Sequence, residues 1–309
     1  MTAMTDTPDL TALPAATTAR RDVARTLYWS VRRELWENRA IWVAPMAAAG
    51  VVLFGYLIAM AQLPERFPAE RPGHHHAMSM PPPEAPYAFA GIVILATAAV
   101  TGLFYCLGAL GAERRDRSIL FWKSLPVSDG VTVVSKLALP MVVLPVVTYA
   151  TIVATILVVL GLSAAASAAT GSPNAAAVTH IDLAKMLVDF AYFVVTATIW
   201  YAPAFAWCLL VGGWARRVAF LWAAGAPLAL MVIEQIAFGT SYVGHAVAER
   251  LGGGLDQSFS VASHAPHTMG APFPDPLGFI TSPGLWIGIG VAAALIAAAI
   301  WLRRTRDPI

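Results

Sequence analysis

GLWIGIGVAAALIAAAIWL, residues 284–302, is an uninterrupted apolar stretch that is followed directly by Arg303 and Arg304. A helix that crosses the hydrocarbon core of a bilayer needs about 20 consecutive, mostly apolar residues. This stretch contains no charged residue at all, so it predicts a membrane-spanning helix. The basic pair that follows it predicts that the span ends at a membrane surface.

Five further stretches have the same character, at residues 41–61, 87–111, 137–162, 186–213 and 218–239. The whole chain is 58% hydrophobic and 12% charged, whereas a soluble domain carries roughly 25% charged residues. We therefore predict an all-α polytopic membrane protein with six transmembrane helices. Residues 20–305 form a single membrane domain after a disordered tail, 1–19, and prolines inside the spans predict kinks.

Basic residues alternate along the chain with the predicted spans. They cluster before the first span, in the second and fourth connections, and in the C-terminal tail. The other connections, 62–86, 163–185 and 240–283, hold only Arg66, Arg71, Lys185 and Arg250. Because basic loops stay on the cytoplasmic side, we expect both termini in the cytoplasm of a bacterial cell, with the chain multi-pass in its inner membrane.

The segment before the first span is predicted to form an amphipathic helix. Val23, Leu27, Val31 and Leu35 recur at four-residue steps, which is a helical spacing. We expect this helix to lie in the cytoplasmic interface, with its apolar face in lipid and its arginines near anionic headgroups. A soluble cytosolic helix is the alternative.

The chain has no sequence motif for catalysis or nucleotide binding. The patterns GxxxxGK[ST], HExxH, CxxC and GxSxG do not occur, and these would mark a phosphate loop, a zinc site, a redox or metal pair and a serine nucleophile. We therefore expect no enzymatic activity, no cofactor and no nucleic-acid partner. Transport, scaffolding or signalling remain as function classes.

The second connection, 112–136, carries the most informative sequence. It begins with Glu113, Arg114, Arg115, Asp116 and Arg117. An apolar centre with Phe121 and Trp122 follows, and Leu125-Pro126 then breaks the helix before Ser128 or Asp129 caps the next one. Exposed aromatics on a short cytoplasmic loop suit either the lipid interface or a groove on a partner protein.

This loop resembles the first cytoplasmic loop of ABC-2-type permeases, the membrane subunits of a class of ATP-binding-cassette transporters that are mostly exporters. The matching residues are Glu113, Arg114, Asp116, Ser118, Ile119, Phe121, Ser124, Leu125, Pro126, Val127 and Ser128. Arg117 departs from the family, which often has glycine there. The family also has an amphipathic helix before the first span, six spans and both termini inside.

The resemblance implies a mechanism. In the family this loop forms a coupling helix that docks on a separate ATPase subunit, and two permease subunits form the transport pathway. It therefore implies an ABC ATPase and a second permease subunit, identical or paralogous, as partners in the lipid bilayer. The coupling candidates are Glu113, Arg114, Arg115, Asp116, Arg117, Phe121, Trp122, Leu125 and Pro126. Alternatively, these residues only anchor the loop at the lipid surface.

Polar residues inside two predicted spans are further candidates. Glu234 and Gln235 lie in the fifth span, and Asp189 lies near the outer end of the fourth. A carboxylate in hydrocarbon is costly, so it should face a partner, a cavity or water. For Glu234 a structural hydrogen bond and a role in the pathway are both open, whereas for Asp189 the simpler interpretation, that it reaches the interface, is favoured over a functional role.

The histidines all fall in the three predicted outer segments. His74, His75, His76, His264 and His267 are weak candidates for metal binding, although their spacing is not a tetrahedral ligand pattern. They leave an integral-membrane enzyme or metal-handling protein open as an alternative function. A secondary carrier and a membrane anchor that recruits a partner are the others.

Overall fold

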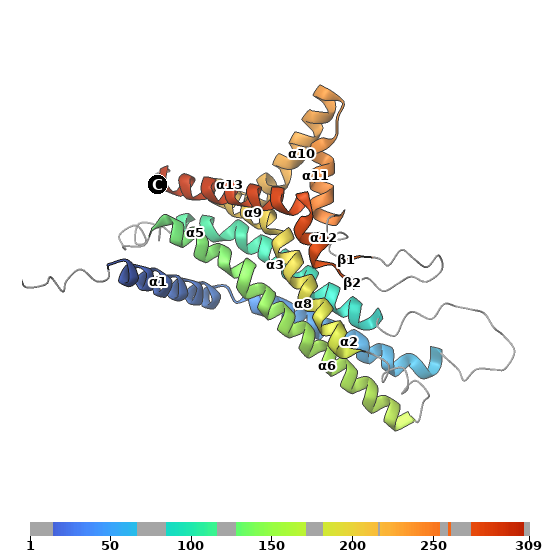
Figure 1. Ribbon diagram of the computed structural model, residues 1–309. Helices are drawn as coiled ribbons and strands as arrows, with labels where there is room; N and C mark the ends of the chain where they lie inside the picture. The colour runs from blue at the N-terminus through green and yellow to red at the C-terminus, as the bar shows by residue number, and fades with distance from the viewer. Residues whose placement is uncertain are drawn as a thin grey trace, which may run out of the picture.

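The computed structural model describes residues 15–66, 85–115, 128–170, 182–215, 217–253, 259–260 and 273–305. Most of these residues are helical (Figure 1). The helices are α1 (Ala15–Glu37), α2 (Ala40–Arg66), α3 (Ala85–Arg115), α5 (Asp129–Ala138), the π-helical turn η1 (Leu139–Val143), α6 (Leu144–Thr170), α8 (Leu183–Trp200), α9 (Ala202–Trp214), α10 (Ala219–Phe238), α11 (Tyr242–Ala248), the π-helical turn η2 (Glu249–Gly253), α12 (Pro276–Thr281) and α13 (Pro283–Thr305). Two short strands, β1 (Phe259–Ser260) and β2 (Phe273–Pro274), pair antiparallel.

Six helical segments are long and apolar enough to cross a membrane. They are Ala40–Ala61, Pro86–Ala112, Asp129–Ala166, Leu183–Trp200, Ala219–Phe238 and Pro283–Thr305. The third segment is continuous through α5, η1 and α6. The prediction of an all-α polytopic membrane protein is therefore confirmed.

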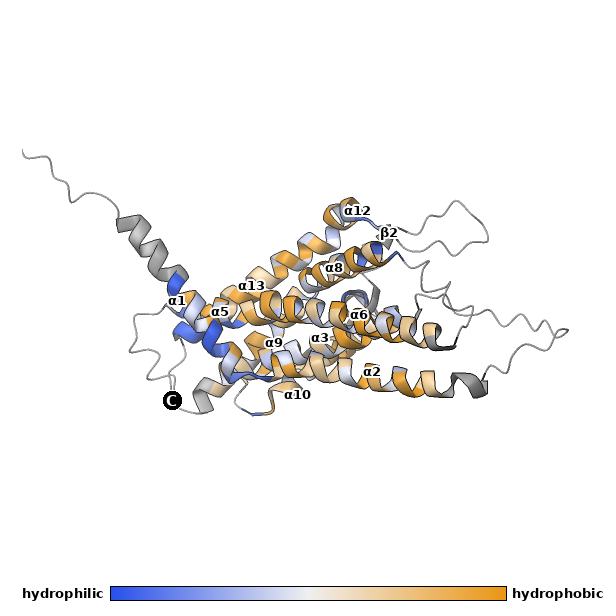
Figure 2. Cartoon of the chain, turned by 90° about the horizontal axis from the view of Figure 1, so that it is seen from below, coloured by the Kyte–Doolittle hydropathy of each residue, from blue (hydrophilic) through white to orange (hydrophobic). Residues whose placement is uncertain are grey.

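Polar residues gather at one end of the helix bundle. Figure 2 shows hydrophobic residues along the length of the helices and hydrophilic ones on α1 and α5. The C-terminal end of α13 lies at the same end as α1 and α5 (Figures 1 and 2). We call this end, which carries Lys136 and Arg303, the basic end.

The most extensive helix contacts join α3, α9 and α13. Gly212 of α9 permits the close approach to α3, because an added Cβ would collide with the carbonyl oxygen of Leu107. On the other side, a Cβ on Gly111 would lie 3.0 Å from the Gly212 carbonyl oxygen. Small residues are what allow helix backbones to approach closely in a membrane, where packing drives association.

Two of the long helices are interrupted where prolines remove backbone donors. In η1 the N–H of Leu144 donates to the Leu139 carbonyl, five residues back, so the α-helical pattern is widened around Pro140. Between α8 and α9 the interruption is Tyr201, and Pro203 occupies the first turn of α9, where its missing N–H costs nothing. The sequence predicted one helix over 186–213, and the structure has two.

Helix α10 stands away from the bundle with α11 beside it (Figure 1). None of its residues is buried by the rest of the described chain. It departs at Val218, whose φ of 49° is unusual for a β-branched residue. Pro227 cannot donate to the Ala223 carbonyl, and the Trp207 indole Nε1–H of α9 donates to that oxygen instead, at 3.0 Å.

Helix is present in two regions for which the sequence predicted a disordered tail, 1–19, and an outer connection, 240–283. Helix α1 begins at Ala15, inside the tail 1–19, because alanines favour helix. The outer segment 240–283 contains α11, η2, α12 and the β1–β2 pair. Asp275 caps α12 by accepting a hydrogen bond from the Gly278 N–H at 2.9 Å, and Pro276 supplies a favourable first helical residue.

Candidate functional site at the basic end of the bundle

The predicted docking loop joins α3 to α5 at the basic end. Helix α3 ends at Arg115 and α5 begins at Asp129, so both ends of the loop belong to helices of the bundle. Glu113, Arg114 and Arg115 form the last residues of α3. The remaining coupling candidates lie outside the described residues: Asp116, Arg117, Phe121, Trp122, Leu125 and Pro126. Their role stays a prediction.

Helix α5 follows the loop, and its sequence defines where the helix begins. The Ser128 hydroxyl oxygen accepts a hydrogen bond from the Val131 N–H at 3.3 Å, which makes Ser128 the N-cap and Asp129 the first helical residue. Asp129 lies in the first turn, where its negative charge complements the helix dipole. One face, which includes Val133 and Lys136, is buried.

Lys136 forms a buried ion pair with α1. Its Nζ lies 2.5 Å from the Glu34 Oε1, and the two side chains are 3% and 15% exposed. The Tyr105 hydroxyl of α3 donates to the other carboxylate oxygen of Glu34 at 3.1 Å. This small polar cluster therefore ties together α1, α3 and the end of α5. Because a charge without a partner is costly when buried, the three helices are held in one arrangement.

A second ion pair fixes the beginning of α5. The Arg303 Nε of α13 donates to the Asp129 Oδ1 at 2.9 Å. Arg303 is 6% exposed and Asp129 is 26% exposed, so this pair is the more accessible of the two. Helix α5 is thus held at its start by α13 and at its end by α1.

Helix α1 uses its apolar residues differently from the prediction. Val31 and Leu35 pack against the hydrophobic core beside α3 and α5, so the expectation that they lie in lipid is wrong. The reason is Glu34, which shares their face and needs Lys136. Tyr28, Trp29 and Trp36 are the exposed large side chains of α1, and the Arg32 guanidinium lies 5.1 Å from the centre of the Trp29 ring.

Glu234 closes the turn between α10 and α11. Its carboxylate accepts hydrogen bonds from the backbone N–H groups of Tyr242 and Val243, at 2.6 and 2.8 Å, and from the Thr240 hydroxyl at 2.9 Å. These are the unsatisfied donors of a helix N-terminus. Of the two roles that the sequence leaves open, the structure therefore favours the structural hydrogen bond.

The other two intramembrane candidates have no shared site with Glu234 among the described residues. Asp189 accepts from Lys185 at 2.9 Å across one turn of α8. Gln235 has an exposed side chain on α10. The pair with Lys185 therefore accounts for Asp189 within α8. An ion pair at this spacing on an accessible helix face contributes only about 0.3–0.5 kcal/mol.

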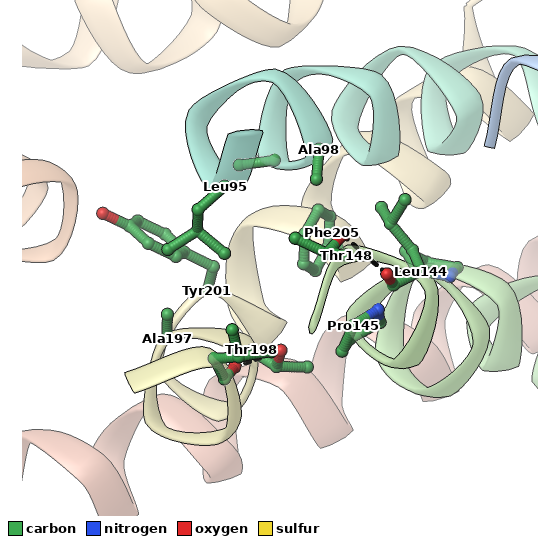
Figure 3. Close-up of a pocket in the computed structure, with 12 residues that line it drawn as sticks. Leu95, Ala98, Leu144, Pro145, Thr148, Ala197, Thr198, Tyr201 and Phe205 are labelled. Atoms are coloured by element: carbon green, nitrogen blue, oxygen red, sulfur yellow. Dashed lines mark hydrogen bonds between the residues drawn. The ribbon is translucent and has the colours of Figure 1, made fainter. Parts of the chain in front are cut away.

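A cavity of about 30 Å³ lies between the two interrupted helices. Figure 3 shows Leu95 and Ala98 of α3 on one side, facing Leu144, Pro145 and Thr148 of α6 and residues on both sides of Tyr201. The Thr148 hydroxyl donates to the Leu144 carbonyl at 2.7 Å. The volume is room for about two water molecules, so in this conformation the cavity excludes an organic substrate.

Arg250 joins three segments at the far side of the break at Tyr201. Its guanidinium carbon lies 4.0 Å from the centre of the Trp200 ring, and its Nη2 donates to the Gly284 carbonyl at 2.8 Å. In return the Trp200 Nε1–H donates to the Arg250 carbonyl at 3.0 Å. Burial lowers the pKa of the guanidinium. Gly288 makes room for this side chain, because an added Cβ would collide with it.

The sequence did not single out the residues of these contacts. In the sequence, Lys136 and Arg250 stand out only as basic residues of two connections, whose charges indicate the topology of the spans. Glu34 carried a usable signal, since it lies on the helical face of Val31 and Leu35, where a carboxylate requires a partner. The identity of that partner was not accessible, because it comes from a helix far along the chain.

The metal hypothesis rests on residues outside the described part of the chain. His74, His75, His76, His264 and His267 all lie there. Within residues 15–66, 85–115, 128–170, 182–215, 217–253, 259–260 and 273–305, no group of three His, Cys, Asp or Glu side chains is placed to hold a metal ion.

Comparison of the chain with protein-family models, curated proteins and solved structures finds no match. Its function is therefore argued from the sequence of the loop and the geometry of the basic end.

Proposed function

We propose that this chain is the membrane-spanning permease subunit of an ABC-2-type transporter. An ATPase on a separate subunit docks on the loop between α3 and α5, from the cytoplasm of a bacterial cell, and its hydrolysis of ATP drives export of a substrate. The resemblance of the loop sequence to the ABC-2 family supports this assignment.

One structural observation carries the proposal. The loop returns to the bundle through α5, which is fixed to α13 by Asp129 and to Glu34 of α1 by Lys136, and Glu34 also accepts a hydrogen bond from Tyr105 of α3. A displacement applied to the loop therefore reaches α13 and α1 directly and α3 through Glu34. This is what a docking site for an ATP-driven partner requires, because a flexible tether would not pass force to the spans.

The proposal also includes a second permease subunit, identical or paralogous. Helix α10 buries none of its residues within the described chain, although nearly all of them are apolar. A helix of this kind is normally covered, by lipid or by other helices. The exposed α10 leaves space for a second subunit beside the bundle.

Co-purification tests the proposal. The chain is expressed together with an ABC-type Walker-motif ATPase from the same genome, and ATP hydrolysis is measured with and without the chain in lipid nanodiscs. We expect a stable complex and stimulated hydrolysis, both lost in the double variant Phe121→Ala/Trp122→Ala. The matched control is Trp286→Ala/Ile287→Ala, which removes two exposed side chains of α13 far from the loop. Stimulation that persists in the loop variant contradicts the assignment.

A secondary carrier is the second candidate. Carriers bind substrate where discontinuous helices meet inside the membrane, and here η1 and the break at Tyr201 line one cavity. Proteoliposomes that contain the chain alone distinguish the two. Substrate uptake driven by an ion gradient, without an ATPase, would favour the carrier.

A further inference from the structure

Helix α5 has different attachments at its two ends. Its last turn carries Lys136, whose ion pair with Glu34 is deeply buried and is supported by Tyr105. Its first residue, Asp129, pairs with Arg303 at a more accessible position, where the carboxylate is 26% exposed. The start of α5, at Asp129, is also the end that the loop joins, through Ser128.

The π-helical turn η1 follows directly after the buried end. Pro140 lies at its start, and the hydrogen bond from Leu144 to Leu139 spans five residues instead of four. π turns inside α-helices recur at functional sites, and both π turns and prolines are common causes of helix kinks. Bending is therefore easiest between α5 and α6.

Geometry makes the two ion pairs respond differently to such a bend. Asp129 lies ten residues before the turn, which is about 15 Å at 1.5 Å per residue, and Lys136 lies about 4.5 Å before it. A bend of about 10° moves the start of α5 by roughly 2.6 Å and moves Lys136 by less than about 1 Å. The bend separates Asp129 from Arg303 and leaves Lys136 on Glu34.

A void borders the turn where this bend occurs. Pro140, Leu144 and Pro145 line the cavity between η1 and the break at Tyr201. Well-packed interiors resist displacement because they lack voids.

We propose that α5 is a latched lever. Its pivot is η1, its base is held on α1 by the Lys136–Glu34 pair, and its tip is latched to α13 by the Asp129–Arg303 pair. While the latch is closed, a pull on the start of α5 passes to α13; when the latch opens, the start of α5 moves by bending at η1 and the membrane-spanning part of α6 stays in place. The pull of a docked ATPase on the tip rests on the proposed function, whereas the latch belongs to this chain alone.

Hydrogen exchange of the full chain in lipid nanodiscs tests the latch without any partner. In Asp129→Asn we expect the amides of α5 to exchange about tenfold faster, the effect of losing one charge-assisted hydrogen bond. Amides of α6 should keep their exchange rate. The matched control, Glu37→Gln, breaks the exposed Arg33–Glu37 pair at 2.6 Å and should leave α5 unchanged.

Two further variants separate the latch from other effects of the substitution. Arg303→Gln removes the same pair from the α13 side and keeps the favourable charge of Asp129 at the helix start, so it should speed α5 exchange as Asp129→Asn does. Adding Pro140→Ala to Asp129→Asn restores a regular helix at the pivot and should return α5 exchange toward the original rate.

The outcomes decide the proposal in either direction. Faster exchange confined to α5, reversed by Pro140→Ala, supports the lever. Unchanged exchange in α5 overturns the lever, because the Asp129–Arg303 pair would then stabilise nothing. Equal acceleration in α5 and α6 also overturns it, because the pair would then stabilise the whole bundle. If no ATPase co-purifies but the latch opens as described, the proposed function fails and the lever stands.

Discussion

Replacing Lys136 by methionine should destabilise the bundle strongly. Lys136 is 3% exposed and its partner Glu34 is 15% exposed. Removing the cation leaves the largely buried Glu34 carboxylate without its charged partner, a loss that costs about 3–5 kcal/mol when one partner of a buried pair is deleted. Methionine keeps the length of the side chain, so the volume of the site changes little.

The double variant Lys136→Met/Glu34→Leu should recover most of that stability. Replacing both members of a buried pair by apolar residues is often neutral or stabilising. The Tyr105 hydroxyl then loses Glu34 as its acceptor, at a cost of about 1 kcal/mol. We therefore expect the double variant to be about 1 kcal/mol less stable than the original chain and much more stable than the single variant.

The assay is thermal unfolding in detergent, followed by the loss of the monodisperse peak on size exclusion after heating. The order of midpoints should be original chain, double variant, single variant. The exposed pair supplies the control, since Glu37→Gln should shift the midpoint little. A single variant as stable as the original chain, or a double variant as unstable as the single one, would refute the energetic role given to this pair.

Three further outcomes follow from individual contacts. Gly212→Ala should lower the unfolding midpoint by an amount equivalent to about 1–3 kcal/mol, because the added Cβ meets backbone atoms that no rotamer change can relieve. Gly225 has open space around it, so Gly225→Ala should raise the midpoint slightly. Trp207→Phe should cost about 1–3 kcal/mol, and adding Pro227→Ala should restore stability by returning a backbone donor to the same carbonyl. Glu234→Gln should speed hydrogen exchange at the start of α11 without changing exchange in α13.

The long apolar helices could be predicted from the sequence because hydropathy is a local property. Each span needs only its own composition to be recognised, and of the prolines inside the spans, Pro140 and Pro203 lie at interruptions whereas Pro227 lies within a continuous helix. The form of the interruption was not predictable: Pro140 produces a π turn within a continuous helix, whereas Pro203 begins a new one. Which form arises depends on the neighbouring helices that satisfy the freed backbone groups.

The candidate site was predictable only in part. The loop 112–136 was found from its charges and aromatics, and Ser128 is confirmed as the cap of α5. The contacts that fix α5 could not be inferred, because Glu34 and Arg303 come from opposite ends of the chain. The surroundings of Val31 and Leu35 could not be predicted either, since an apolar helix face packs equally well on lipid or on protein.

Topology mapping tests the central claim most directly, because the proposed docking loop must face the cytoplasm. Single cysteines are introduced at exposed positions in a chain whose own cysteines, Cys106 and Cys208, are buried. An impermeant maleimide applied to intact cells should label Asp182→Cys and Leu277→Cys. It should label Arg25→Cys and Thr305→Cys only after the membrane is opened. Labelling of Arg25→Cys or Thr305→Cys in intact cells, or of Leu277→Cys only after opening, would contradict the six-span arrangement and the docking site that depends on it.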